Sequence, residues 1–187
     1  MEQKLFAISN VLCGKDIKAI RKNLTLTQAE FAQLCNVSVK TIERWEGSDK
    51  EITGPIVTLM KVLREYPQIR EELEIPARAY QMRLWYMHED EICTIIDVEE
   101  RKRLVKVYNY TKDYIFRAFG REERPTFDQY EEFLESRCFP RSRDKMKLIL
   151  RELDLPFYEP LMIIEKTQGR MAEDKLLIVR CWYIRSF

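Results

Sequence analysis

The residues best suited to bind another molecule lie close together, in the segment 39–46. Apolar residues at helical spacing place Ile42 and Trp45 on one side of this segment. The residues left on the opposite side are Val39, Lys40, Thr41, Glu43 and Arg44. Exposed lysine and arginine side chains donate several hydrogen bonds each, which suits a polar or anionic ligand. We therefore expect this side of the segment to be a binding surface.

Other residues that could carry chemistry are scarce or badly spaced. His88 is the only histidine, and it stands beside the acidic run 89–91 with no second nitrogen or thiolate ligand at metal-binding spacing. Glutamates such as those at 99–100 are adjacent in sequence and point apart, which makes them poor acid–base pairs. Gly169 stands alone, without the following lysine of a phosphate-binding loop. We therefore expect that the protein is not an enzyme and that it binds neither a metal ion nor a cofactor.

The composition narrows the class of protein further. Lysine and arginine total 32 and aspartate and glutamate total 31, a formal net charge of +1. Affinity for a polyanion must therefore come from a local arrangement of charge. The five cysteines are far apart and form no Cys-x-x-Cys pair, which predicts reduced thiols. No signal peptide and no run of roughly 18 apolar residues is visible, so we expect a cytoplasmic location.

Four helices are expected around the segment 39–46, and each has a recognisable start. Their expected N-caps are Asp16, Thr27, Ser38 and Thr53. Glu30 follows Thr27 at the spacing of a capping box. Pro55 falls in the first turn of the last helix, where its missing N–H costs nothing. Asn36 occupies the turn before the third helix, and after glycine asparagine best tolerates the left-handed backbone expected there.

The same region resembles a known family. The runs that carry the resemblance are Leu26-Thr27-Gln28-Ala29-Glu30-Phe31-Ala32, Asn36-Val37-Ser38 and Thr41-Ile42-Glu43-Arg44-Trp45-Glu46-Gly47. They resemble the phage-repressor-like (XRE) helix-turn-helix family over residues 16–67, about a quarter of the chain. The later residues 53–55 and 66–67 are similar to host-inhibition-of-growth type antitoxin regulators. Asn36 and Ile52 depart from that pattern, which usually has glycine and proline there.

The resemblance implies DNA binding and assigns roles by position. Val39, Lys40 and Arg44 would face base edges in the major groove, where the two cations suit guanine and the valine suits the thymine methyl. The residues expected at DNA phosphates are Gln28, Ser38, Thr41, Lys18, Arg21 and Lys22. The alternative is a helical domain used only for protein contact. It leaves a donor-rich helix face unexplained.

The sequence changes character after the proline-bracketed segment 67–76. Runs rich in β-branched and aromatic residues predict strands at 81–87, 92–98, 104–110 and 176–183. Helical patterns follow Thr126 and Ser142 as expected N-caps and cover 126–138 and 142–153, and 161–166 is a short apolar segment. The expected fold is therefore a mainly α domain and linker at 1–76, with four to five helices. An α+β domain with a smaller sheet follows at 77–187.

A basic run in the second half is a possible partner-binding site. Its cations are Arg137, Arg141, Arg143, Lys145, Lys147 and Arg151, against only Asp144. One interpretation is a surface for an acidic protein or nucleic acid. The other, favoured by alternating rather than helical spacing, is a solvated helix face.

These observations lead to a functional hypothesis with one rival. We expect a sequence-specific transcriptional repressor of its own operon that binds a palindromic double-stranded operator as a homodimer. The rival is a bifunctional inhibitor, an antitoxin or anti-CRISPR of a mobile element, whose residues 77–187 block a partner protein. An enzyme ranks last, because no catalytic set is visible.

Overall fold

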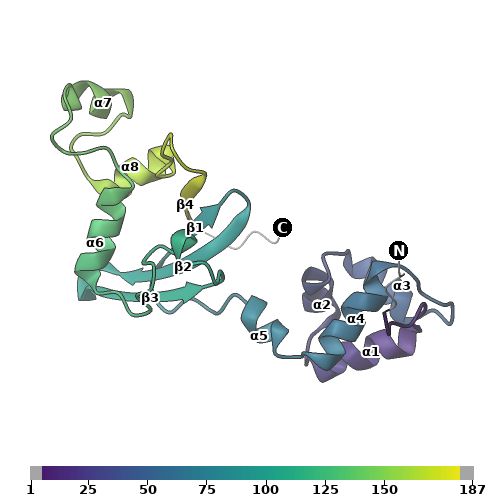
Figure 1. The fold of residues 1–187 in the computed structure, drawn as a ribbon. Coiled ribbons are helices and arrows are strands. Elements are labelled where there is room, and N and C mark those ends of the chain that lie inside the picture. The colour runs from purple at the N-terminus through teal and green to yellow at the C-terminus, as the bar shows by residue number, and fades with distance from the viewer. Residues whose placement is uncertain (1–5, 182–187) are drawn as a thin grey trace, which may run out of the picture. The chain divides into compact units, whose positions relative to one another are not determined.

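The computed structural model describes residues 6–181 (Figure 1). The chain divides into two compact units, Met1–Ile75 and Pro76–Phe187, which we call unit 1 and unit 2. Unit 1 is helical and unit 2 combines a sheet with helices, so the predicted fold class is confirmed. Within the described residues, none of the helices combines the length and the apolar character that crossing a membrane requires.

Unit 1 is built from five helices in its described part. They are α1 Gly14–Asn23, α2 Gln28–Leu34, α3 Val39–Glu46, α4 Pro55–Glu65 and α5 Ile69–Leu73. Apolar side chains at helical spacing meet in one core, whose most buried members are Ile17, Phe31, Ile42, Met60 and Leu63. An isolated bridge between Leu12 and Ile52 ties the segment before α1 to the segment before α4.

The capping residues of α2 and α3 act as the sequence predicts. The Thr27 hydroxyl accepts the Glu30 N–H at 3.3 Å, and the Glu30 carboxylate accepts the Thr27 N–H at 2.7 Å. The Ser38 hydroxyl accepts the Thr41 N–H at 3.2 Å. Asn36 has a φ of 52°, which confirms the left-handed turn between the two helices. Local side-chain chemistry therefore sets where α3 begins.

Two of the N-caps predicted in unit 1 are wrong. Cys13 is the N-cap of α1, and Asp16 lies inside the first turn, where its carboxylate accepts the Cys13 N–H at 3.2 Å. Helix α4 is capped by Gly54 rather than Thr53, because the chain enters it with a φ of 95°, a conformation that favours glycine. Pro55 does occupy the first helical position, as expected.

Unit 2 contains a four-stranded antiparallel sheet in the order β3-β2-β1-β4. The strands are β1 Met82–His88, β2 Glu91–Glu99, β3 Leu104–Asn109 and β4 Leu176–Arg180. All four predicted strands are present, although positions 182–183 of the last one lie outside the described residues. Leu84 pairs with Ile96 on the face that contributes to the main core.

Three helices and two short 3-10 turns complete the described part of unit 2. They are α6 Phe127–Ser136, α7 Met146–Glu152, α8 Pro160–Thr167, η1 Glu100–Lys102 and η2 Tyr114–Phe116. Helices α6 and α8 pack against each other and against the sheet, while α7 lies beyond them and away from it (Figure 1). Thr126 caps α6 as predicted.

The predicted helix at 142–153 starts too early. Residues 140–143 form a turn in which the Arg143 N–H donates to the Pro140 carbonyl at 3.0 Å. Helix α7 begins only after Lys145, whose backbone is left-handed, so Ser142 is not an N-cap. The apolar segment 161–166 proves to be most of α8, which Pro160 begins.

A buried ion pair anchors the beginning of unit 2 to the opposite face of the sheet. The Arg83 guanidinium donates to both oxygens of Asp97 at 2.6 and 2.7 Å, and the two side chains are 1% and 0% exposed. Arg83 also donates to the Pro76 and Ala77 carbonyls, and Asp97 accepts the Ala79 N–H at 2.7 Å. The pair therefore satisfies the backbone of the segment that enters the sheet.

We expect removal of Asp97 to destabilise unit 2 strongly. The Asp97→Ala variant leaves the Arg83 charge buried and unpaired, which typically costs about 3–5 kcal/mol. Asp128→Ala is the control, because it breaks an ion pair to Arg103 whose members are exposed, and such pairs add little to stability. Urea unfolding measures the free energies, and hydrogen exchange in β1 and β2 locates the loss. Equal effects of the two substitutions would contradict the role of the buried pair.

Candidate nucleic-acid interface

The outer face of α3 is open to solvent. Val39 is 39% exposed, and the side chains of Lys40 and Arg44 are exposed as well, while Ile42 points inward and is fully buried. Glu43 shares the exposed side. The structure thus brings together the three residues that the sequence predicts for base contacts. The side-chain donors of Lys40 and Arg44 are therefore exposed to solvent.

The predicted phosphate-binding hydroxyls lie at the start of the same helix. The Ser38 and Thr41 side-chain oxygens are 2.9 Å apart, and the Ser38 hydroxyl also caps α3. Lys18 and Lys22 are exposed on α1. These four side chains and Gln28 keep their predicted role as a hypothesis, because their polar groups lie at or near the surface.

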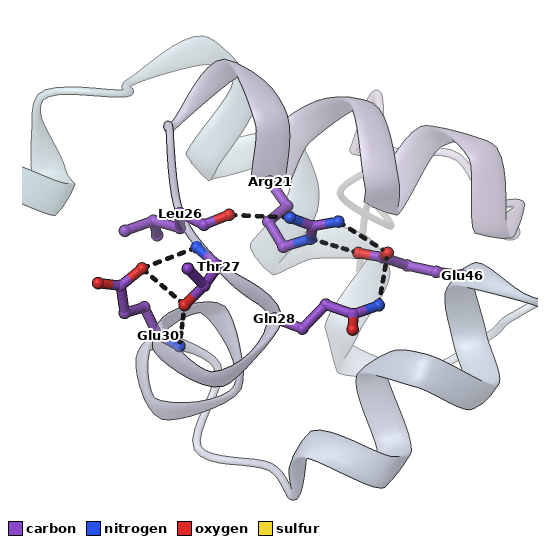
Figure 2. A network of polar contacts seen from close by, with 6 residues as sticks. All are labelled: Arg21, Leu26, Thr27, Gln28, Glu30 and Glu46. Carbon is purple, nitrogen blue, oxygen red and sulfur yellow. Dashed lines mark hydrogen bonds and ion pairs between the residues drawn. The ribbon is translucent and has the colours of Figure 1, made fainter.

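A buried carboxylate connects the helices beneath this face (Figure 2). Glu46, the last residue of α3, accepts hydrogen bonds from Arg21 of α1 at 2.6 and 3.0 Å. Gln28, the first residue of α2, donates its side-chain amide to the same carboxylate at 3.0 Å. Arg21 further donates to the Leu26 carbonyl at 2.9 Å. One carboxylate thus connects α1, α2 and α3 and fixes their relative positions.

The network also fixes the charge states of its members. The hydrogen bonds from Arg21 hold the pKa of Glu46 below its ordinary value, while the same contact raises the pKa of Arg21. Burial acts in the opposite direction on both groups but is outweighed. Both groups are therefore ionised across the physiological range, and their charges cancel inside the domain.

Arg21 consequently does not have the role predicted for it. Its side chain is only 13% exposed, and three of its N–H groups donate to Glu46 and the Leu26 carbonyl. A phosphate contact would require the ion pair to open, so Arg21 positions the helices instead. The role of Glu46 was not predicted from the sequence. The signal was present, because Glu46 is an acidic residue on the side of α3 that carries buried Ile42.

Gln28 is oriented by the same carboxylate. Because one amide hydrogen points to Glu46, the other N–H and the side-chain carbonyl remain for a ligand. Gln28 lies at the first position of α2, next to the capping residue Thr27. A phosphate at this point would meet a side chain that is already fixed.

The basic run of unit 2 is divided by the structure. Arg137 is buried, and its guanidinium donates to Asp174 at 2.6 and 3.1 Å and to the carbonyls of Gly169 and Leu176. The prediction that Arg137 contacts a partner is therefore wrong, because its donors close the core between α6 and β4. The hydrogen bonds from Arg137 also lower the pKa of Asp174.

The rest of the basic run is exposed. Arg141 pairs with Glu135 at 2.8 Å and covers the Tyr158 ring. The cations Arg143, Lys145, Lys147 and Arg151 are exposed around α7. Among residues 6–181, no cluster of three or more histidine, cysteine, aspartate or glutamate side chains is arranged to hold a metal ion.

Comparison with known proteins agrees with this geometry. Residues 17–60, which contain most of α1, all of α2 and α3, and the first half of α4, match the family model described as "Helix-turn-helix". They form a helix-turn-helix domain. The antitoxin HigA-2 of Vibrio cholerae is 32% identical to the chain over 53 residues, which are 28% of this chain and 51% of that protein. The chain thus spans about half the length of this curated relative. The helix-turn-helix match supports DNA binding by α2 and α3, and the predicted resemblance is confirmed.

The central ion pair of the helix-turn-helix domain should make its stability depend on pH. The pKa of Glu46 in the folded domain lies below its pKa in the unfolded chain, which is about 4.3. The stabilisation is therefore complete above that value and is lost as the pH falls through the folded pKa.

Glu46→Gln cannot titrate, so it should be less stable than the wild type at neutral pH and should lose less stability on acidification. Urea unfolding at a series of pH values measures this difference. Glu43→Gln, on the exposed side of α3, is the matched control and should follow the wild type. If the Glu46→Gln and wild-type curves run parallel down to acid pH, the ion pair does not stabilise the domain.

Proposed function

We propose that this chain is a transcriptional repressor that binds an operator in its own promoter through α3. The observation that carries the proposal is the outer face of α3. There, Val39, Lys40 and Arg44 are exposed on a helix whose opposite side is locked in the core. An α-helix fits the major groove, where guanine offers two acceptors and thymine a methyl group.

The charge of the domain supports the same proposal. Arg21 and Glu46 neutralise each other internally, whereas Lys18, Lys22 and Lys40 are exposed. A nearly neutral chain can therefore still present a locally positive surface to DNA. Contacts to phosphates from Gln28 and the α3 hydroxyls would fix the register, and the side chains of α3 would read the bases.

A second function is favoured by the similarity to an antitoxin and by the size of unit 2. We propose that unit 2 also binds and inhibits a protein encoded near this chain, while unit 1 represses their common promoter. The exposed cations around α7 would attract an acidic partner and make the association sensitive to salt. In that arrangement the chain is a regulator and an inhibitor at once.

Arg44→Ala should change which DNA sequence is bound. Loss of a bidentate contact to guanine typically removes about 1–3 kcal/mol of discrimination at one base pair. Gln28→Ala should instead weaken binding to all sequences more evenly. Arg64→Ala, which changes an exposed side chain of α4, is the control and should leave binding unchanged. Fluorescence anisotropy with DNA from upstream of the gene tests this, and unchanged selectivity in Arg44→Ala would refute the groove assignment.

We also expect a homodimer. One helix-turn-helix domain reads only a few base pairs, so two copies on half-sites one helical turn apart would supply the missing affinity. Residues 77–187 should carry most of the dimer contact. Light scattering at tens of micromolar protein should give twice the monomer mass, both for the full chain and for a fragment of residues 77–187. A monomer both free and on DNA would rule the dimer out.

A further inference from the structure

The segment after β3 presents two adjacent large apolar side chains to solvent. Ile115 is 79% exposed and Tyr114 is 48% exposed, and both lie in η2. The third residue of that turn, Phe116, points inward, where it packs against the core and lies 4.5 Å from the His88 ring. The inward contact anchors the turn, so its two outward side chains are held at the surface.

Hydrogen bonds at both ends keep this turn ordered. The Asp113 carboxylate accepts the Ile115 N–H at 3.0 Å, and the Asp113 N–H donates to the Thr111 hydroxyl at 3.2 Å. After the turn, the Ala118 N–H donates to the Thr94 hydroxyl of β2 at 3.2 Å. The backbone of this turn is therefore already ordered before a partner covers Ile115, which removes one of the usual costs of binding.

Two arginines flank the exposed tyrosine. The guanidinium carbons of Arg117 and Arg121 lie 4.7 and 5.4 Å from the centre of the Tyr114 ring. Across residues 6–181, neither guanidinium forms an ion pair with a carboxylate. The neighbouring Glu122 side chain instead accepts the Arg124 N–H at 2.8 Å. The Arg117 Nε–H donates to the Thr111 carbonyl at 2.8 Å, which leaves the terminal nitrogens of Arg117 and the Arg121 guanidinium as donors for an external acceptor.

We propose that Tyr114, Ile115, Arg117 and Arg121 form a docking site for a protein segment that combines apolar side chains with carboxylates. The apolar groups would cover Ile115 and Tyr114, and the carboxylates would pair with the two guanidiniums, whose fork suits them. Tyrosine and arginine are enriched among the residues that contribute most to protein–protein binding. The site consists of residues of unit 2 and does not depend on the DNA binding proposed for α3.

A nucleic acid is the competing anionic ligand, and the apolar tip argues against it. Phosphates could contact Arg117 and Arg121, and a base could stack on Tyr114. Neither contact would cover Ile115, the most exposed large apolar side chain among the described residues 76–181 of unit 2. A protein segment supplies both the apolar surface and the negative charge.

A peptide library displayed on phage and selected on the full-length chain tests the proposal. Synthetic copies of the enriched peptides are then titrated against the wild type and against Ile115→Ser and Arg121→Glu. Leu104→Ser is the matched control, because Leu104 is 41% exposed in β3, outside both this site and the cations around α7. Equal melting temperatures establish that all variants are folded.

We expect enriched peptides to contain aspartate or glutamate beside apolar residues. They should bind the two site variants at least about tenfold more weakly, a loss of about 1.4 kcal/mol, and bind the control like the wild type. The proposal fails if no peptide is enriched, or if the enriched peptides bind Ile115→Ser as tightly as the wild type. It also fails if Arg121→Glu weakens only binding to random DNA.

Discussion

The arrangement of unit 1 depends on the ion pair between Arg21 and Glu46. Its two hydrogen bonds join the first helix to the end of the third, and Gln28 connects the second helix to the same carboxylate. An arginine–carboxylate fork fixes direction as well as distance. The exposed face of α3 therefore keeps one orientation relative to α2. The proposed DNA binding requires such a fixed orientation, because one helix would read bases while its neighbour contacts phosphates.

Close packing reinforces this constraint. A Cβ atom on Gly14 would lie 2.1 Å from the Trp45 carbonyl oxygen, so α1 can approach the end of α3 only because this residue is glycine. Unit 2 also contains arginine–carboxylate pairs with a buried guanidinium, at Arg83–Asp97 and at Arg137–Asp174. Several arginines that look like surface charge in the sequence are thus internal. The charge available to partners lies on other residues.

The sequence predicts features that depend on neighbouring residues. Thr27, Ser38 and Asn36 act within a few positions of themselves, so their roles could be read directly, as could the alternation that marks the strands. Arg21 could not be assigned correctly, because its partner is 25 residues away. Arg137 is held by Asp174, which is 37 residues away. The surface at Ile115 was missed for another reason, since the apolar run 114–116 is too short to show a periodic pattern.

The central claim is that α3 reads DNA sequence. The most direct measurement is selection of bound sequences from a random pool of double-stranded DNA by the full chain and by a Lys40→Ala, Arg44→Ala double variant. The account predicts that the wild type enriches a defined motif and that the double variant loses preference at particular positions of it. Enrichment of no motif by the wild type, or of the same motif by both proteins, would contradict it.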